Sequence, residues 1–301
     1  MSVQQQDLRG AFGHVEAWVF DLDNTLYSGH CDLFPQIDRR MGEFIARSLD
    51  LPIEEAQTLR KTYYFEHGTT LAGLVRVHGV SPHEFLDYVH DIDLSAVLPA
   101  PELVSAIAAL PGRKFVFTNA SRGHAERVMA RLGLDASFED IFDIHALEYI
   151  HPKPAREAFE RFIKAHGVSP REAAMFDDLP ANLETAHAIG MTTVLVDCPL
   201  TEHPQHQAIV DWTELPAHVH HRTDALAPFL TAIGTALSEM GEPPRLESPP
   251  PSRGKAREGG SSTADAAPPS APQAAPAPAQ GGSKEPEDGP APNPQRLRAA
   301  S

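Results

Sequence analysis

The sequence predicts an α/β fold, in which a doubly wound parallel sheet forms the core and an all-helical cap is inserted after the first strand. Two observations support this prediction, and a third concerns the end of the chain. Short runs rich in β-branched and aromatic residues alternate with segments of helical periodicity. The long segment between the first two runs has helical periodicity only. The end of the chain, residues 242–301, is dominated by Pro, Ala, Gly and Ser, which predicts a disordered C-terminal tail.

The apolar runs are of strand length, and each is expected to be a buried strand. Strands that alternate with helices at this spacing favour a parallel, Rossmann-like sheet, in which the ligand sits outside the carboxyl ends of the strands. The five runs are AWVFDLD (17–23), KFVFTNA (114–120), IFDIHAL (141–147), AAMFDDL (173–179) and TTVLVD (192–197).

Two helices between these runs have clear end signals. SRGHAERVMARLG begins with Ser121 as a cap and ends at Gly133, the residue type that most often follows a helix. LPANLETAHAIG has Pro180 in its first turn and Gly190 after its last. Both segments are therefore expected to be helices that return the chain to the sheet.

Periodicity and composition together divide the chain into three predicted parts. We predict an α/β core over residues 14–27 and 100–240, a helical cap over 28–99, and a disordered tail over 242–301. The tail holds 14 of the 28 prolines and almost no aromatic or β-branched residue whose burial would offset the entropy lost on ordering.

The charge balance restricts the partners. The chain has 25 basic and 41 acidic residues, a net charge of −16, and the tail contributes almost nothing to the imbalance. The excess of acidic residues in the core argues against a nucleic-acid duplex or an anionic membrane as partner, because both are negatively charged. Two cysteines are too few for a disulfide framework. The sequence has no signal-peptide pattern and no apolar stretch of about 18 residues, so we expect a cytoplasmic protein.

Two acidic pairs follow predicted strands. Asp21 and Asp23 end the first strand, and strand alternation places both side chains on one side of the chain. Asp177 and Asp178 end the fourth. Carboxylates this close repel one another unless they share a cation, and an oxygen-rich site of this kind suits Mg²⁺. For the first pair alone, a turn or a helix cap is the alternative interpretation.

Two further segments carry groups suited to phosphate. Thr118 and Asn119 end the second strand just before a helix, where a hydroxyl and free backbone N–H groups form a phosphate cradle. Lys153 lies between Pro152 and Pro154, which restrict where its charge can go. Taken singly, a plain helix cap and a solvated lysine remain the alternatives.

Together these motifs resemble those of the haloacid dehalogenase-like hydrolase superfamily. The resemblance spans residues 18–197, and the motifs occur in order at predicted strand ends: Asp21-x-Asp23-x-Thr25, Thr118, Lys153 and Asp177-Asp178. Within the cap, TYYFEHGTTLAGL, together with LDNTLY and FTNASRGHAERV, resembles the bacterial pyrimidine 5′-nucleotidase branch. The chain departs from the pattern in having Asp177-Asp178 instead of Gly-Asp or Glu-Asp, and Asn182 where some families have an acid.

The resemblance implies a magnesium-dependent phosphatase that acts through a phospho-aspartate on Asp21, with Asp23 as acid and base. It implies that Mg²⁺ is held by Asp21, the backbone carbonyl of Asp23 and Asp178, with Asp177 in support. Lys153 would supply a second positive charge. The phosphate oxygens would be held by Thr118, the backbone N–H of Asn119 and Lys153.

The expected substrate is a small phosphorylated metabolite, most of all a pyrimidine nucleoside 5′-monophosphate. A sugar-phosphate or phosphoglycolate phosphatase is the alternative within the same fold. A dehalogenase is disfavoured because it should lack the acid at Asp23 and needs no metal, and a non-catalytic binding protein working through its tail is a further alternative. The candidates for substrate specificity in the cap are Tyr63, Tyr64 and Phe65 for stacking on a base and Glu66, His67 and Thr70 for hydrogen bonding, although the aromatic residues could equally pack the cap interior.

A group of histidines near the end of the sheet lacks regular metal-ligand spacing. A solvated loop is therefore the favoured interpretation for them. The residues are His203, His206, His218, His220 and His221.

Overall fold

The computed structural model describes residues 3–198, 206, 209 and 212–239, with side chains from Leu8 onward. The predicted tail, residues 242–301, lies outside the described residues. None of the described helices is both long and apolar enough to span a bilayer. The sheet and all the described helices fall within one compact unit.

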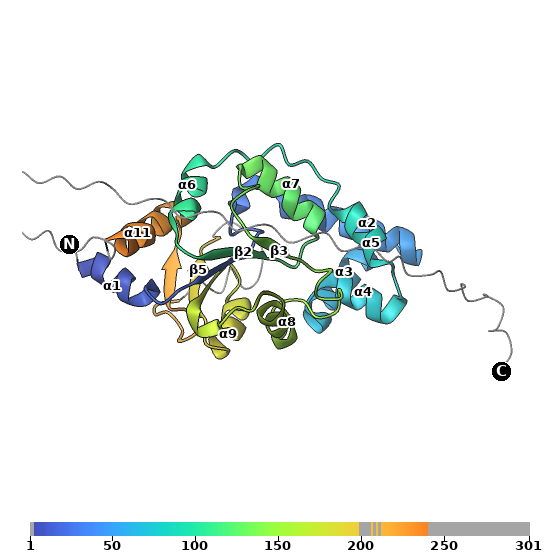
Figure 1. Cartoon of the computed structure of the whole chain (residues 1–301). Coiled ribbons are helices and arrows are strands. Elements are labelled where there is room, and N and C mark those ends of the chain that lie inside the picture. The colour runs from blue at the N-terminus through green and yellow to red at the C-terminus, as the bar shows by residue number, and fades with distance from the viewer. Residues whose placement is uncertain (1–2, 199–205, 207–208, 210–211, 240–301) are drawn as a thin grey trace, which may run out of the picture. The chain divides into compact units, whose positions relative to one another are not determined.

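Helices and strands alternate along most of the described chain (Figure 1). In chain order the elements are α1 (Val3–Phe12), β1 (Ala17–Phe20), η1 (Gly29–Cys31), α2 (Leu33–Leu49), α3 (Ile53–His67), α4 (Thr70–His78), α5 (Pro82–Val89), α6 (Pro101–Ala109), β2 (Arg113–Phe117), α7 (Arg122–Leu132), β3 (Asp140–Phe142), α8 (Arg156–His166), η2 (Pro170–Glu172), β4 (Ala173–Asp177), α9 (Pro180–Ala188), β5 (Thr192–Val196), β6 (His221–Thr223) and α11 (Leu226–Ser238).

The strands form one parallel sheet in the order β3-β2-β1-β4-β5-β6, which confirms the predicted fold class. The chain runs from β1 outward to β3, then returns to β4 on the other side of β1, so the order reverses beside β1. Ligands of such sheets bind at this reversal. Two details were predicted wrongly: β6 was missed, and the third run forms a strand only over Asp140–Phe142.

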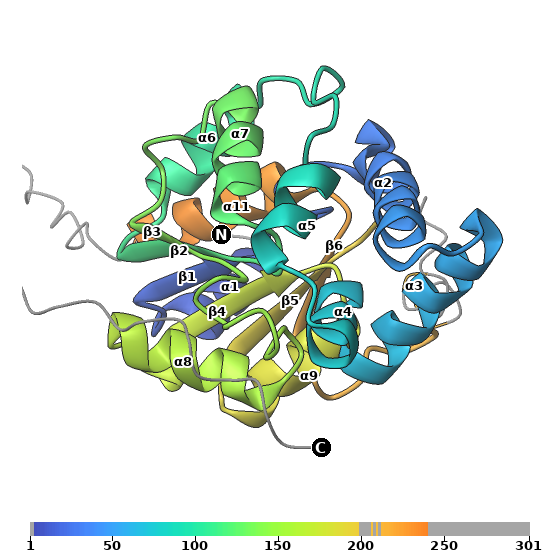
Figure 2. The ribbon, with the colours of Figure 1, turned by 90° about the vertical axis from the view of Figure 1, so that its right-hand side faces the viewer.

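Both faces of the sheet are buried, as expected when helices cover each side. Alternate side chains of β1 supply the two cores. Trp18 and Phe20 pack in one cluster with residues of α6, α7 and α11. Val19 packs in the other with residues of α8 and α9. Figures 1 and 2 show α6 and α7 on one side of the sheet and α8 and α9 on the other.

Four α-helices, α2 to α5, follow β1 and precede α6, which leads into β2. They lie together at one end of the sheet (Figures 1 and 2). An edge-to-face pair of Phe44 and Phe85, with ring centroids 5.2 Å apart, joins α2 to α5 in their interior. All four helices lie inside residues 28–99, the predicted cap.

The ends of helix α7 match their predicted signals. The Ser121 hydroxyl accepts a hydrogen bond from the backbone N–H of His124, and Gly133 closes the helix with a φ of 81°. This fixes α7 directly after the end of β2, which matters for the site described below.

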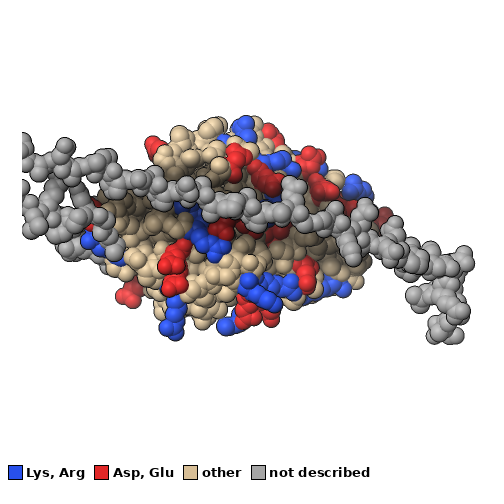
Figure 3. Space-filling view, in the orientation of Figure 1, with Lys and Arg blue, Asp and Glu red and all other residues tan. Residues whose placement is uncertain are grey.

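On the face shown in Figure 3, basic side chains are interspersed with acidic ones and form no broad basic surface.

Candidate active site

Three carboxylates meet where β1 and β4 end. Phe20 is in register with Phe176, and the backbone N–H of Asp21 donates to the Phe176 carbonyl at 2.8 Å, so Asp21 lies beside Asp177. Asp178 follows at once. All three acids are buried, and one oxygen from each lies within 4.8 Å of the others. The register of a parallel pair thus brings together acids that are more than 150 residues apart in the chain.

Lys153 joins two of these acids. Its Nζ lies 2.9 Å from Asp21 Oδ1 and 2.8 Å from Asp177 Oδ2, and only 2 % of the residue is exposed. Burial lowers the pKa of Lys153, but the charges of Asp177 and Asp21 outweigh it and raise the pKa above its ordinary value. The lysine is therefore a fixed cation in the centre of the site.

One lysine does not balance three carboxylates. Burial raises the pKa of Asp21 well above its usual value, Lys153 opposes the rise, and the charges of Asp177 and Asp178 add to it. Burial and the charge of Asp177 raise the pKa of Asp178 in the same way. A second cation would relieve this excess of negative charge. The donors are all carboxylate oxygens, so the cluster fits a hard divalent ion such as Mg²⁺.

The three acids differ in how their oxygens are used. Asp177 accepts from Asn182 Nδ2 at 2.8 and 3.0 Å, from the Leu179 backbone N–H at 2.9 Å and from Lys153, so both of its oxygens are occupied. Asp21 and Asp178 are therefore the better candidates to hold an ion. Asp177 instead orients Lys153.

Asp23 is not one of the three acids whose oxygens lie within 4.8 Å of one another, although its charge also acts to raise the pKa of Asp21. Its Oδ1 accepts from the Tyr27 hydroxyl at 2.6 Å and lies 3.3 Å from His124 Nε2. Burial raises the pKa of Asp23, but the hydrogen bond and charge of His124 and the hydrogen bond of Tyr27 outweigh it and lower the pKa. Of the four predicted acids, three converge and the fourth faces a histidine.

The side chain of Asn119 binds the backbone of Lys153, a contact that the sequence did not indicate. Its side-chain Nδ2 donates to the Lys153 carbonyl at 2.9 Å, and its Oδ1 accepts from the Lys153 backbone N–H at 2.8 Å. Thr118, buried beside it, accepts from the Ala120 backbone N–H at 3.0 Å. The second strand end therefore positions Lys153, besides offering the backbone groups expected to meet phosphate.

The predicted cap residues divide between the cap interior, the surface and the acids. The Tyr63 hydroxyl bonds His78 Nε2 at 2.7 Å, its ring contacts His67, and buried Thr70 donates to the Arg60 carbonyl. Glu66 is exposed, as is 69 % of Phe65. These five residues are thus committed to the cap or to its surface.

Tyr64 is the exception. Burial raises the pKa of its hydroxyl to about 12, and the charges of Asp178 and Asp177 add to the rise. Of the six predicted cap residues, Tyr64 is thus the one on whose hydroxyl the charges of Asp178 and Asp177 act. Its ring also contacts that of Phe65, with centroids 5.4 Å apart.

Sequence reasoning missed several partners of the acids. His206 was expected in a solvated loop, but its ring is buried and its Nε2 lies 2.7 Å from Asp178 Oδ2. His220 is exposed, in keeping with a solvated loop, and its Nδ1 also lies 2.9 Å from the buried Thr193 hydroxyl. His203 lies outside the described residues. His124 and Tyr27 were not singled out, although the cap at Ser121 placed His124 in the first turn of a helix at the sheet edge.

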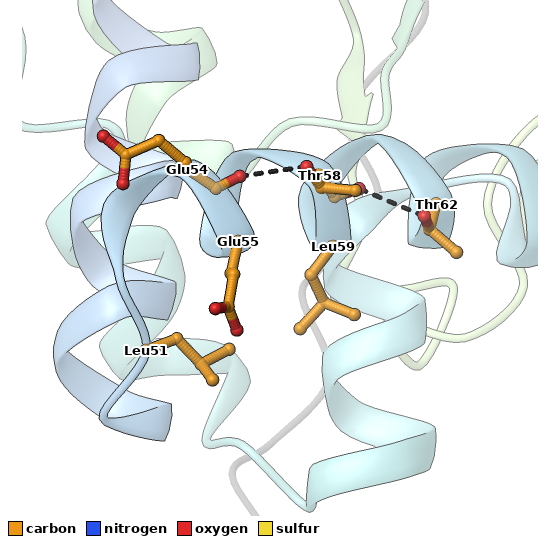
Figure 4. Close-up of a pocket in the computed structure, with 6 residues that line it drawn as sticks. All are labelled: Leu51, Glu54, Glu55, Thr58, Leu59 and Thr62. Carbon is orange, nitrogen blue, oxygen red and sulfur yellow. Dashed lines mark hydrogen bonds between the residues drawn. The ribbon is translucent and has the colours of Figure 1, made fainter.

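A surface depression on the cap lies elsewhere. It is lined by residues of α3 and the loop before it: Leu51, Glu54, Glu55, Thr58, Leu59 and Thr62 (Figure 4). The hydroxyls of Thr58 and Thr62 donate hydrogen bonds to backbone carbonyls of the same helix, at 2.9 and 3.1 Å. No predicted site residue lines this depression, so it is not part of the acidic site.

Comparisons with known proteins agree with the family that the motifs resemble. A family model described as haloacid dehalogenase-like hydrolase matches residues 15–190. Phosphate metabolism protein 8 of Saccharomyces cerevisiae is 28 % identical over 197 residues, which cover 60 % of this chain and 61 % of that protein. Fructose-1-phosphate phosphatase YqaB of Escherichia coli is 31 % identical over 121 residues, which cover 38 % of this chain and 63 % of that protein.

The chain thus matches about three fifths of the length of each of these two curated relatives. Among solved structures, that of a HAD phosphatase from Thermococcus onnurineus superposes with a TM-score of 0.47 at 15 % sequence identity. This superposition covers 71 % of this chain and 96 % of that one.

Proposed function

We propose that this chain, which belongs to the haloacid dehalogenase-like hydrolase family, is a magnesium-dependent phosphatase that hydrolyses a small phosphomonoester through a phospho-aspartate on Asp21. The observation that carries the proposal is the convergence of Asp21, Asp177 and Asp178 around Lys153 at the carboxyl edge of the sheet. Three buried acids with one lysine are costly unless a second cation neutralises their excess charge, and that cation can then bind an anionic substrate.

The nucleophile is Asp21. Lys153 holds one of its oxygens, Oδ1, and thereby orients the other toward the substrate. Attack on phosphorus forms the Asp21–phosphorus bond while the bond to the leaving oxygen breaks, which divides a difficult hydrolysis into two easier displacements. Mg²⁺ held by Asp21 and Asp178 would supply positive charge that reduces the repulsion between carboxylate and phosphate.

Asp23 is the proton donor and acceptor. Because the pKa of Asp23 is lowered in the free chain, the carboxylate must first take up a proton, which the binding of an anionic phosphate beside it favours. This proton passes to the leaving oxygen in the first step. In the second step the Asp23 carboxylate removes a proton from the water that attacks phosphorus, while the bond from Asp21 to phosphorus breaks, which releases phosphate and restores Asp21. Lys153 and the Thr118 hydroxyl, with the backbone N–H of Asn119, contact the non-bridging oxygens of the phosphoryl group. These groups stabilise the charge that develops there.

For the substrate we propose a pyrimidine nucleoside 5′-monophosphate, because the cap sequence resembles that of pyrimidine 5′-nucleotidases and includes a tyrosine, Tyr64, whose hydroxyl is acted on by the charges of the acids. A sugar phosphate is the second candidate. It is favoured by one specific observation, the 31 % identity to a protein named fructose-1-phosphate phosphatase.

A substrate panel separates the two candidates. The purified full chain would be assayed with Mg²⁺ against UMP, CMP, AMP, fructose 1-phosphate, ribose 5-phosphate and phosphoglycolate, with release of inorganic phosphate as the measurement. We expect the highest kcat/KM for UMP or CMP, and no release when EDTA removes the metal. A preference for fructose 1-phosphate would end the nucleotide proposal, and metal-independent turnover would contradict the role of the acidic cluster.

A substitution at Tyr64 tests whether the cap contacts a base. Tyr64→Ala should raise the KM for UMP by roughly 10-fold, because a stacked base loses about 1–3 kcal/mol of contact with the aromatic ring. The KM for ribose 5-phosphate, which has no base, should stay within about twofold. Phe65→Ala is the matched control, since this neighbouring ring is 69 % exposed. Equal effects of Tyr64→Ala on both substrates would rule out stacking on the base.

A further inference from the structure

We propose that His124 is a positioning residue for Asp23: through Asp23 Oδ1 it holds the carboxyl group so that Oδ2 delivers the proton to the leaving group. This inference rests on the proposed function and adds to it a residue outside the four motifs. It concerns a contact between α7 and the segment after β1.

Two donors from different parts of the chain converge on one oxygen. Tyr27, four residues after Asp23, donates its hydroxyl to Oδ1 at 2.6 Å, and His124 Nε2 lies 3.3 Å from the same atom. Among the residues that the structure describes, Oδ2 accepts no hydrogen bond. A carboxyl group held through one oxygen in this way cannot rotate freely, and its second oxygen is the one available for proton transfer.

The ring of His124 is itself held on several sides. It is fully buried, and its backbone N–H is capped by the Ser121 hydroxyl. It stacks on His90, with ring centroids 4.4 Å apart and planes at 21°. His90 is tied in turn to Ser121, its Nδ1 lying 2.9 Å from the hydroxyl oxygen. His90, which directly follows α5, thus supports the residue that supports Asp23.

Packing alone does not account for a histidine here. Its Nδ1 is buried without a hydrogen-bond partner among the described residues, which costs about 1–3 kcal/mol. An apolar ring of similar size would avoid that cost. Among the described residues, the polar contact of the ring is with Asp23, and Nε2 makes that contact as a donor when it carries a hydrogen.

This role predicts a dependence on the leaving group. When an alkyl phosphate is cleaved, the departing alkoxide needs a proton from Asp23 as its bond to phosphorus breaks. When p-nitrophenyl phosphate is cleaved, the phenolate leaves readily without one. Loss of a residue that positions the proton-donating carboxyl group should therefore slow cleavage of the alkyl phosphate far more than cleavage of p-nitrophenyl phosphate.

The test compares His124→Phe, which keeps the ring volume but removes the donor, with His124→Gln, which keeps a donor near the Nε2 position. For the best alkyl phosphate of the panel, His124→Phe should lower kcat by roughly 10- to 100-fold, a part of the whole contribution of general acid catalysis. The kcat for p-nitrophenyl phosphate should change by about twofold or less. His124→Gln should recover most of the loss. Tyr27→Phe removes the other donor and should give the same bias, so the inference remains testable if His124→Phe does not fold.

His14→Phe, at an exposed histidine, is the control for the exchange itself. Equal losses with both substrates, or no loss with either, would overturn the positioning role while leaving the phosphatase proposal intact. Failure of the wild-type chain to hydrolyse any monophosphate, p-nitrophenyl phosphate included, would overturn the phosphatase proposal, and the role of His124 would fall with it.

Discussion

Asp21→Asn should lower turnover by roughly 10⁴-fold or more, because an amide cannot form the acyl phosphate on which both displacements depend. The substitution removes one negative charge from a cluster that holds three acids and one lysine. Lys153 keeps its partner Asp177. The variant should therefore fold, and without metal its thermal midpoint should equal or exceed that of the wild type.

Acid-quenched enzyme is the sharpest measurement for this variant. With a labelled substrate, the wild-type chain should retain label on protein in an acid-stable, base-labile form, and Asp21→Asn should retain none. Asp135→Asn, the same exchange at an exposed site, should behave as the wild type. Turnover by Asp21→Asn within about 10-fold of the wild type would show that another residue is the nucleophile.

The fold was predictable because strand burial leaves a strong local signal. Runs such as AWVF and AAMF are apolar on both faces, as a sheet covered on both sides requires. β6 gave no such signal, because HRT has no apolar residue and is a strand only through its pairing with β5. A short edge strand of this kind is determined by tertiary contacts, which no sequence window contains.

The centre of the site was predictable for a similar reason. Once β1 and β4 are parallel neighbours, the residues after them must meet at one edge, whatever their separation in the chain. His206 follows from no such rule, since its contact with Asp178 is made from a segment beyond β5 that has no periodic pattern. The clamp of Asn119 on Lys153 likewise depends on loop geometry.

In the cap, the sequence could not indicate which of two adjacent tyrosines faces the interior. Tyr63 and Tyr64 are adjacent on one helix, so their side chains point about 100° apart, and only one of them can face the acids. Which one does is set by how α3 packs on α4. Gly73 decides this: a Cβ there would lie 2.4 Å from the Tyr63 ring, so the glycine makes room for Tyr63 in the cap interior. Tyr64 is left on another side of α3, where the charges of Asp178 and Asp177 act on its hydroxyl.

Lys153→Met should cost both activity and stability, and the loss of stability is the more diagnostic. Breaking a buried ion pair by removing one partner typically costs about 3–5 kcal/mol, because the other charge stays buried without compensation. Here two carboxylates, Asp21 and Asp177, lose their shared cation. In metal-free buffer the free energy of unfolding, measured with urea, should fall by roughly that amount. Turnover should fall by roughly 10³-fold, as a charge contacting the phosphoryl group is lost.

A second substitution separates the two effects. In Lys153→Met/Asp177→Asn one of the stranded carboxylates is neutralised, so the free energy of unfolding should recover in part, whereas turnover should stay low because the cation is still absent. Lys164→Met, at an exposed lysine, is the control and should change neither quantity. If Lys153→Met instead keeps wild-type stability, Lys153 does not hold the acids together. If the double variant regains activity, the lysine serves only the fold and does not contact the substrate.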